Sequence, residues 1–130
     1  MRHSSPGRYQ EMEILGASPI QQVVMLYTHI LVNLRHARTD LEAGNIEGRT
    51  DHLDKAQECI NELLGMLAPE RGGEVARNLA SLYAWMLSEL IDINIRNDGR
   101  GLDRVITMVD ELHSAWHQVQ TSNSPQELSA

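Results

Sequence analysis

The chain has 130 residues, which is one domain of ordinary size and too short for two. Its 11 basic and 18 acidic residues give a formal net charge of −7, and Lys55 is the single lysine, so we expect no nucleic-acid partner. No apolar run approaches the roughly 20 residues that span a bilayer, so no membrane insertion is expected. The opening MRHSSPGRYQ has no apolar stretch of the kind found in secretory signals, which favours a cytoplasmic location.

The first long helix is predicted from Ser18 to about Leu41. Ser18 is a favourable N-cap, Pro19 occupies the first helical position, and Gln21 completes a capping box. Apolar residues then recur at spacings of one, three and four, which is typical of one face of an α-helix. The pair Gly44-Asn45 is expected to end this helix.

Three further helices are predicted at about 50–66, 74–97 and 102–120. The stretch Glu70–Gly73 is expected to be a turn, and the stretch Asp98–Gly101 a break between helices. Short connections favour antiparallel neighbours, so the fold class is all-α, an antiparallel up-down four-helix bundle. We expect residues 1–8 and 121–130 to be disordered tails around a single domain at 9–120.

The sequence offers few residues that could catalyse a reaction or bind a metal. Asp110, His113 and His117 share one predicted helix face, and a metal-dependent bundle enzyme that uses them is the alternative hypothesis. A solvated face is the favoured interpretation, because di-metal bundles use Glu-x-x-His pairs and the chain contains none. We therefore predict no catalytic residue, no metal and no cofactor. The lone cysteine, Cys59, lies next to a predicted core position and is interpreted as a packing residue.

Other polar groups favour ordinary surface roles. His29 and His36 lie off the main apolar face of the first helix, where contact with a partner or sensitivity to pH is the alternative to a plain surface position. Four acidic residues at helical spacing are interpreted as a solvated face, with attraction to a basic partner as the alternative. They are Asp51, Asp54, Glu58 and Glu62.

Apolar residues outnumber the predicted core positions. Helices that are apolar on more than one face either pack on both sides or bind another chain. Core packing explains many of these residues, and a groove for a partner helix explains the rest. The surplus positions are Met25 and Val32 on the first helix, and Val75, Trp85, Ile91 and Ile95 on the third.

Several short motifs together resemble the FliS family of flagellar secretion chaperones, over about residues 9–119. The most specific one is Gly72-Gly73-Glu74-Val75-Ala76-Arg77-Asn78-Leu79, followed by Leu82-Tyr83. Upstream lie Tyr9-Gln10, Ser18-Pro19, Met25-Leu26-Tyr27 and Lys55-Ala56-Gln57, and downstream Ala115-Trp116. The chain departs from the family pattern at Gln22, where Leu is usual, and at Thr28-His29.

This resemblance implies a chaperone without enzymatic activity. Such proteins bind the C-terminal segment of flagellin in the cytoplasm, prevent premature polymerisation, and deliver the subunit to the export gate of the flagellar type III apparatus. Leu82 joins the surplus apolar residues as a candidate partner contact. The free protein is a possible homodimer, and a self-assembling structural subunit is a further alternative.

The segment before the first helix is expected to act as a short strap. Tyr9, Met12 and Leu15 recur at a spacing of three and precede the cap at Ser18. A peptide this short does not fold on its own, so its apolar residues must either pack against the bundle or remain exposed to solvent. The resemblance implies that these residues cover part of the flagellin-binding groove in the free protein and are displaced when flagellin binds.

Overall fold

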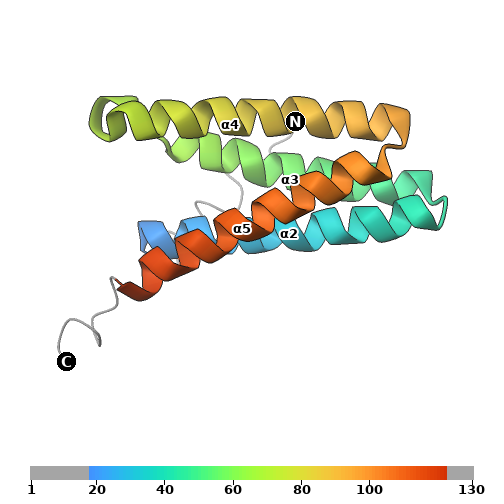
Figure 1. Ribbon diagram of the computed structural model, residues 1–130, viewed down its shortest axis with the longest axis horizontal. Helices are drawn as coiled ribbons and strands as arrows, with labels where there is room; N and C mark the ends of the chain where they lie inside the picture. Colours follow the sequence, from blue (N-terminus) through green and yellow to red (C-terminus); the bar gives the residue numbers. More distant parts are fainter. Residues whose placement is uncertain (1–17, 123–130) are drawn as a thin grey trace, which may run out of the picture.

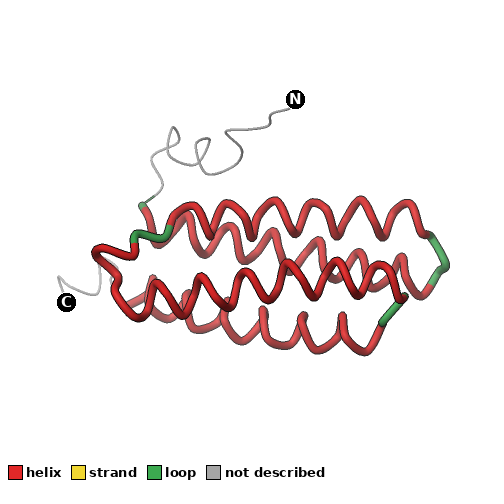
Figure 2. The backbone as a smooth tube through the Cα atoms, turned by 90° about the horizontal axis from the view of Figure 1, so that it is seen from above, coloured by secondary structure: helices red, strands yellow, loops and turns green. Residues whose placement is uncertain are grey.

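Four α-helices make up residues 18–122, the part of the chain that the computed structural model describes. They are α2 (Pro19–Glu42), α3 (Ile46–Met66), α4 (Pro69–Arg96) and α5 (Gly99–Ser122), and no strand occurs in that range. Figures 1 and 2 show the helices running alongside one another, with short turns at the two ends of the bundle. The predicted all-helical fold, with four helices packed as a bundle, is confirmed. No helix within these residues is both long and apolar enough to cross a membrane.

Helix α2 begins as its sequence predicts. The backbone N–H of Gln21 donates to Ser18 Oγ at 3.2 Å, and the N–H of Ser18 donates to Gln21 Oε1 at 2.8 Å. This reciprocal capping box satisfies two backbone donors that the helix itself leaves unpaired, and Pro19 has no N–H to leave exposed. The helix ends at Glu42, and Gly44 follows with a positive φ of 73°.

Helix α3 begins at Ile46, four residues before the predicted start. Asn45, expected only to end the preceding helix, also caps this one, because its Oδ1 accepts a hydrogen bond from Gly48 N at 3.0 Å. A Cβ on Gly48 would lie 2.6 Å from Asn45 Nδ2, so this glycine makes room for the capping side chain. The prediction failed because one residue serves two helices.

Helix α4 also starts earlier than predicted. The stretch Glu70–Gly73, expected to be a turn, forms a first helical turn that begins at Pro69 and bends at Gly73. Gly73 has φ 57° and ψ −129°, a conformation that is accessible essentially to glycine alone. The glycine pair therefore interrupts the helical geometry, and regular helix resumes at Glu74, where the sequence predicts the helix to start.

The turn from α4 to α5 is tighter than expected. Asn97 takes the left-handed conformation with φ 57°, and Asp98 Oδ1 accepts a hydrogen bond from Gly101 N at 2.9 Å. This cap lets α5 begin at Gly99, three residues before the predicted start, and the helix continues to Ser122. Thr121 and Ser122 are thus helical, although a disordered tail was expected from 121.

The core is aliphatic with one buried pair of tyrosines. Tyr27 of α2 and Tyr83 of α4 join their hydroxyl groups at 2.8 Å across the bundle, and both side chains are fully buried. Around them pack leucine, isoleucine, valine and methionine side chains from all four helices. Cys59 is buried among them, as the packing interpretation predicted.

Neighbouring helices are also joined by polar contacts. The buried Arg49 of α3 donates to Asn94 Oδ1 at 2.7 Å and to the Asn94 carbonyl at 3.2 Å, and it also bonds the side chain of Asn97. Its positive charge therefore lies at the C-terminal end of α4, where the helix dipole favours a cation. On the other side of the bundle, Arg38 of α2 bonds Asp103 of α5 at 2.8 Å.

Candidate functional site

The surplus apolar residues of α4 are exposed. Val75 is 67% exposed, Trp85 46% and Ile95 76%, and Ile91 is similarly open, whereas Leu82 is half-buried at the edge of the core. Burial of a large apolar side chain stabilises a fold by roughly 1.5–3 kcal/mol, and each exposed side chain lacks this contribution. Packing inside this bundle therefore does not account for the four exposed residues.

These residues lie on two sides of α4. At about 100° per residue, Ile91 and Ile95 are on the side that carries Asn94, which faces α3. Leu82 and Trp85 are on the other side of the core row, toward α5. Helix α5 packs chiefly on α2, and Figure 1 shows that it diverges from α4 beyond their connecting turn.

A third apolar surface lies on the outer face of α2. Met25 and Val32 are two turns apart, and both are exposed. Helices α2 and α4 each pack against α3 and α5, so they are diagonal to one another, and their outer faces point in different directions. The candidate residues therefore do not converge on one pocket. The remaining three candidates, Tyr9, Met12 and Leu15, lie outside the described residues.

The proposed metal ligands do not assemble. Asp110 Oδ1 lies 3.6 Å from Arg35 Nη2, His113 Nε2 lies 2.9 Å from Thr28 Oγ1, and His117 is beside Thr121. Within residues 18–122 no group of three or more metal-binding side chains is arranged to hold an ion. The hydrogen bond between His113 and Thr28 also gives a structural role to one of the departures from the family pattern.

The two histidines of α2 differ in their surroundings. His36 is exposed and its ring meets the ring of His52 edge-on, with centroids 5.0 Å apart. His52 Nδ1 in turn lies 2.7 Å from Asp40 Oδ2, so this group joins α2 to α3. His29 is half-buried, and its carbonyl accepts a hydrogen bond from Asn33.

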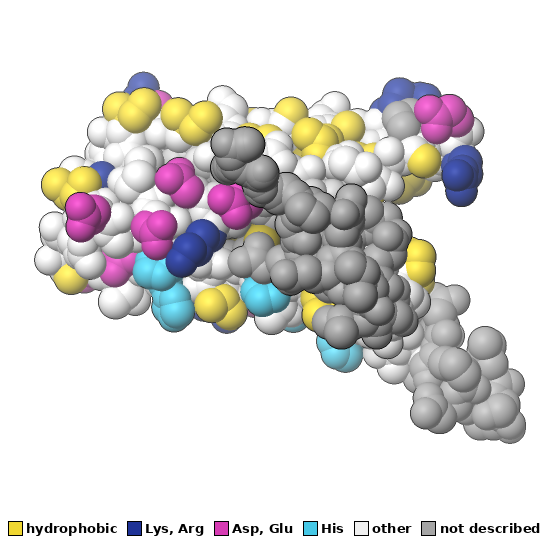
Figure 3. All heavy atoms as spheres, turned by 180° about the vertical axis from the view of Figure 1, so that it is seen from behind, with side chains coloured by type: hydrophobic (Ala, Val, Ile, Leu, Met, Phe, Trp, Pro, Cys, Tyr) yellow, Lys and Arg dark blue, Asp and Glu magenta, His cyan; other side chains and the backbone are white. Residues whose placement is uncertain are grey.

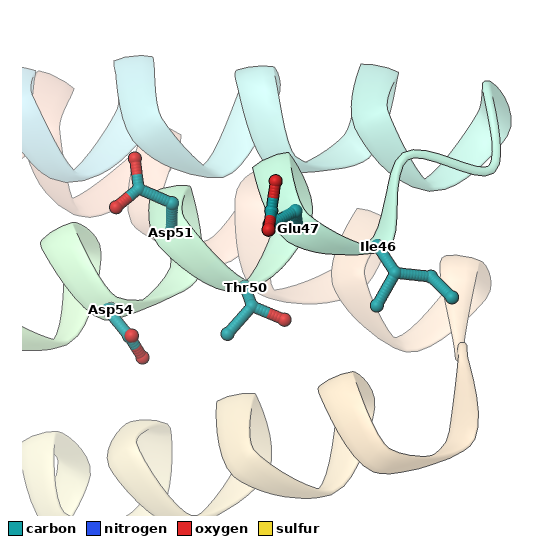
Figure 4. Close-up of a pocket in the computed structure, with 5 residues that line it drawn as sticks. All are labelled: Ile46, Glu47, Thr50, Asp51 and Asp54. Carbon is teal, nitrogen blue, oxygen red and sulfur yellow. The ribbon is translucent and has the colours of Figure 1, made fainter.

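The acidic face of α3 is largely solvated, as predicted. Asp51, Asp54 and Glu58 are exposed, while Glu62 is partly buried. Two of these residues, together with Ile46, Glu47 and Thr50, line an open cavity of about 580 Å³. Figure 4 shows Ile46, Thr50 and Asp54 pointing toward α4, and Figure 3 shows acidic side chains of this region beside apolar side chains.

Sequence reasoning missed two exposed apolar residues. Ile46, at 63% exposure, was overlooked because α3 was expected to begin only at Thr50. The spacing of apolar residues in the last helix predicts a core position for Val119, yet it is exposed near the end of α5. The cap at Asn45 was the available signal for Ile46, whereas no local signal marks Val119, because its exposure depends on where the neighbouring helices end.

Comparison with known proteins gives a consistent match. The profile of the family described as "Flagellar protein FliS" matches residues 2–123. The chain is 36% identical to the flagellar secretion chaperone FliS of Salmonella typhimurium, over 90% of this chain and 87% of that protein. It is 34% identical to the FliS of Vibrio cholerae, over 84% of this chain and 80% of that protein. The corresponding values for the FliS of Bacillus subtilis are 32%, 85% and 81%.

The described residues offer three separate apolar surfaces on a helical bundle. The profile match covers nearly the whole chain, including the Gly72-Gly73 motif that bends α4. The chain belongs to the FliS family of flagellar secretion chaperones.

Proposed function

We propose that this chaperone, which is not an enzyme, binds the C-terminal segment of flagellin in the cytoplasm. Binding keeps the segment from polymerising early and holds the subunit ready for the flagellar type III export gate. The observation that supports this proposal is the exposure of Met25, Val32, Val75, Trp85, Ile91 and Ile95 on an otherwise well-packed bundle. Family membership supports the choice of flagellin as the client.

The physical requirement is a large apolar surface. A client segment that is disordered when free gives up conformational entropy on binding, so many apolar contacts are needed to offset that cost. Exposed side chains on both α2 and α4 provide them. Since these helices are diagonal in the bundle, a segment that contacts both must wrap around α3 or α5.

Calorimetry with a C-terminal flagellin fragment from the source organism tests the proposal. We expect binding with a negative heat-capacity change, because apolar surface leaves water. Trp85→Ser should weaken binding by roughly tenfold or more, since aromatic anchors dominate such interfaces. Arg77→Ser, an exposed change on the same helix, serves as the control and should leave binding within about twofold. Absence of binding at tens of micromolar contradicts the proposal.

The N-terminal strap is proposed to regulate this binding. If Tyr9, Met12 and Leu15 cover part of the client surface, the free chaperone is only partly competent, and its apparent affinity is reduced accordingly. Deletion of residues 1–15 should then tighten or accelerate binding of the fragment. Weaker binding would instead mean that these residues contact the client, and unchanged affinity and rate would reject both roles.

Self-association is the second candidate use of the same surfaces. Exposed apolar patches also favour contact between copies of the chain, so a homodimer of the free protein is plausible on this ground. Light scattering over a range of concentrations distinguishes the two uses. A dimer that dissociates when the flagellin fragment is added would show that the client and the second copy compete for one surface.

A further inference from the structure

The open cavity along α3 is lined by one apolar residue, Ile46, by Thr50 and by three acidic residues. Ile46, Thr50 and Asp54 follow one another at helical spacing, and Figure 4 shows all three pointing toward α4. The cavity has a volume of about 580 Å³, which is the size of several side chains. Glu47 and Asp51 also line it, so three of its five lining residues are acidic.

Apolar residues of α4 continue this surface. Thr50 exchanges hydrogen bonds of 3.3 and 3.5 Å with the side chain of Asn94, which fixes the register of the two helices. Ile91 and Ile95 flank Asn94 along α4, and both are exposed. Ile46 on α3 and Ile91 and Ile95 on α4 are therefore exposed apolar side chains of the two helices that the contact between Thr50 and Asn94 joins. We call these three side chains, together with the cavity, the α3–α4 groove.

The charges around the groove are not balanced by cations. Lys55 Nζ lies 3.3 Å from Asp51, and Arg96 is paired with Asp92 at 3.1 Å on α4. Arg49 is buried, and its guanidinium group donates hydrogen bonds to Asn94 and Asn97. Glu47 and Asp54 are exposed, and neither has an ion-pair partner within residues 18–122. The groove therefore presents negative charge next to exposed apolar side chains.

We propose that the α3–α4 groove selects a basic amphipathic part of the client, in which apolar anchors are flanked by lysine or arginine. This inference rests on the proposed function, because it specifies the chemistry of one part of the same client surface. Apolar anchors on Ile46, Ile91 and Ile95 supply affinity, whereas the acidic residues of the cavity fix register and disfavour acidic segments.

A charge reversal provides the test. Asp54→Lys places a cation in the cavity and leaves Glu47, which lies in the first turn of α3, in its favourable position. Glu111→Lys is the matched control, because Glu111 is exposed on α5 and the change in net charge is the same. Melting temperatures of the two variants, measured alongside, establish that both are folded.

The expected results concern the C-terminal flagellin fragment. Asp54→Lys should weaken its binding roughly three- to tenfold at low salt, and the control should stay within about twofold. The difference between the variants should shrink at high salt, since an interaction between exposed charges is screened. Replacing the responsible lysine or arginine of the fragment by glutamate should restore binding to Asp54→Lys but weaken binding to the wild type.

The outcomes separate the two proposals. A wild-type chaperone that does not bind the fragment overturns the proposed function and this inference with it. A fragment that binds tightly but responds equally to Asp54→Lys and Glu111→Lys overturns the inference alone. The same holds if Ile95→Ser leaves binding unchanged, because Ile95 would then lie outside the client surface.

Discussion

The pair of buried hydroxyl groups at Tyr27 and Tyr83 is the most constrained polar contact in the core. Each hydroxyl would be costly to bury alone, and the 2.8 Å contact between them satisfies both. The two rings are tilted by 58° with centroids 6.5 Å apart, within the range of favourable aromatic pairs. The contact joins diagonal helices and so fixes the distance across the middle of the bundle.

Substitutions at Tyr83 and Trp116 should therefore differ. The sequence places both residues on core rows, but Tyr83 is fully buried while Trp116 is only partly so. We expect Tyr83→Ala to lower the free energy of unfolding by about 3–5 kcal/mol, and Trp116→Ala by less. Tyr83→Phe, which keeps the ring, should cost about 1–3 kcal/mol because the buried Tyr27 loses its hydrogen bond with Tyr83. Denaturant unfolding measures all three, and equal losses for the two alanine variants would contradict this ranking.

Alkaline pH should destabilise the fold through the same pair. Burial is the main cause that raises the pKa of both phenols above the usual 10.0. For Tyr83, the charge of Tyr27 and the hydrogen bond with Tyr27 raise the pKa further. For Tyr27, the hydrogen bonds with Tyr83 and Trp116 partly oppose the rise. Because the pKa of each phenol is higher in the folded than in the unfolded state, the contribution of the neutral phenols to the free energy of unfolding is intact below pH 10. It is lost as the pH rises further. Each group that ionises only on unfolding contributes a slope of up to about 1.4 kcal/mol per pH unit.

Thermal unfolding between pH 8 and 11 checks this expectation. The melting temperature should be nearly flat below pH 10 and fall above it, and the fall should be shallower in Tyr27→Phe, which removes one titrating phenol. Because Lys55 is the only lysine, few other groups titrate in that window. An equally steep fall in the variant would assign the effect to other groups.

At the scale of the helix, the bend in α4 depends on one glycine. Gly73 has a positive φ of 57° and separates a first helical turn from the main part of α4. Gly65, in α3, has ordinary helical geometry and open space around the position of a Cβ. The two glycines therefore respond in opposite ways to the same substitution.

Gly73→Ala should destabilise the protein by about 1–2 kcal/mol, because an L-residue is strained in that backbone conformation. Gly65→Ala should instead stabilise it by roughly 0.5–1 kcal/mol, since alanine loses less backbone entropy in a helix. Equilibrium unfolding in urea compares the two variants directly. Stabilisation by both changes would show that α4 runs straight through residue 73.

At the scale of the whole molecule, the residues that form the core differ from those that we propose to bind the client. The core unites all four helices around Tyr27, Tyr83 and aliphatic side chains, whereas the exposed apolar residues face outward on α2, α3 and α4. This separation suits a chaperone that binds its client stoichiometrically and stays folded without it. It also predicts that the two properties are separable by mutation.

Met25→Ser and Ile95→Ser test this separation together. Each should change the free energy of unfolding by less than about 1 kcal/mol, because the side chains are already exposed, and each should weaken binding of the flagellin fragment. Leu34→Ala, at a fully buried position, should do the reverse and cost about 2–5 kcal/mol of stability. A large loss of stability in Ile95→Ser would mean that this residue supports the fold.

The sequence by itself determined the helical fold and the residues available to a partner. Spacings of three and four, the capping box at Ser18 and the prolines define helices because these signals act within a few residues of one another. The same spacing marked Met25, Val32, Val75, Trp85, Ile91 and Ile95 as surplus, and the structure exposes all six. Helix starts were less well predicted, because Asn45 and Asp98 each act in a turn that both ends one helix and caps the next.

Only the tertiary structure decided how these residues are arranged. The rotation of each helix about its axis determines which of its sides faces a neighbour. Contacts between residues far apart in sequence set this rotation, such as those of Tyr27 with Tyr83 and of Thr50 with Asn94. Those contacts turn the side of α4 that carries Asn94 and Ile91 toward α3, and they leave Leu82 and Trp85 on the other side of that helix. Local sequence signals do not contain this information, because packing between helices is what fixes it.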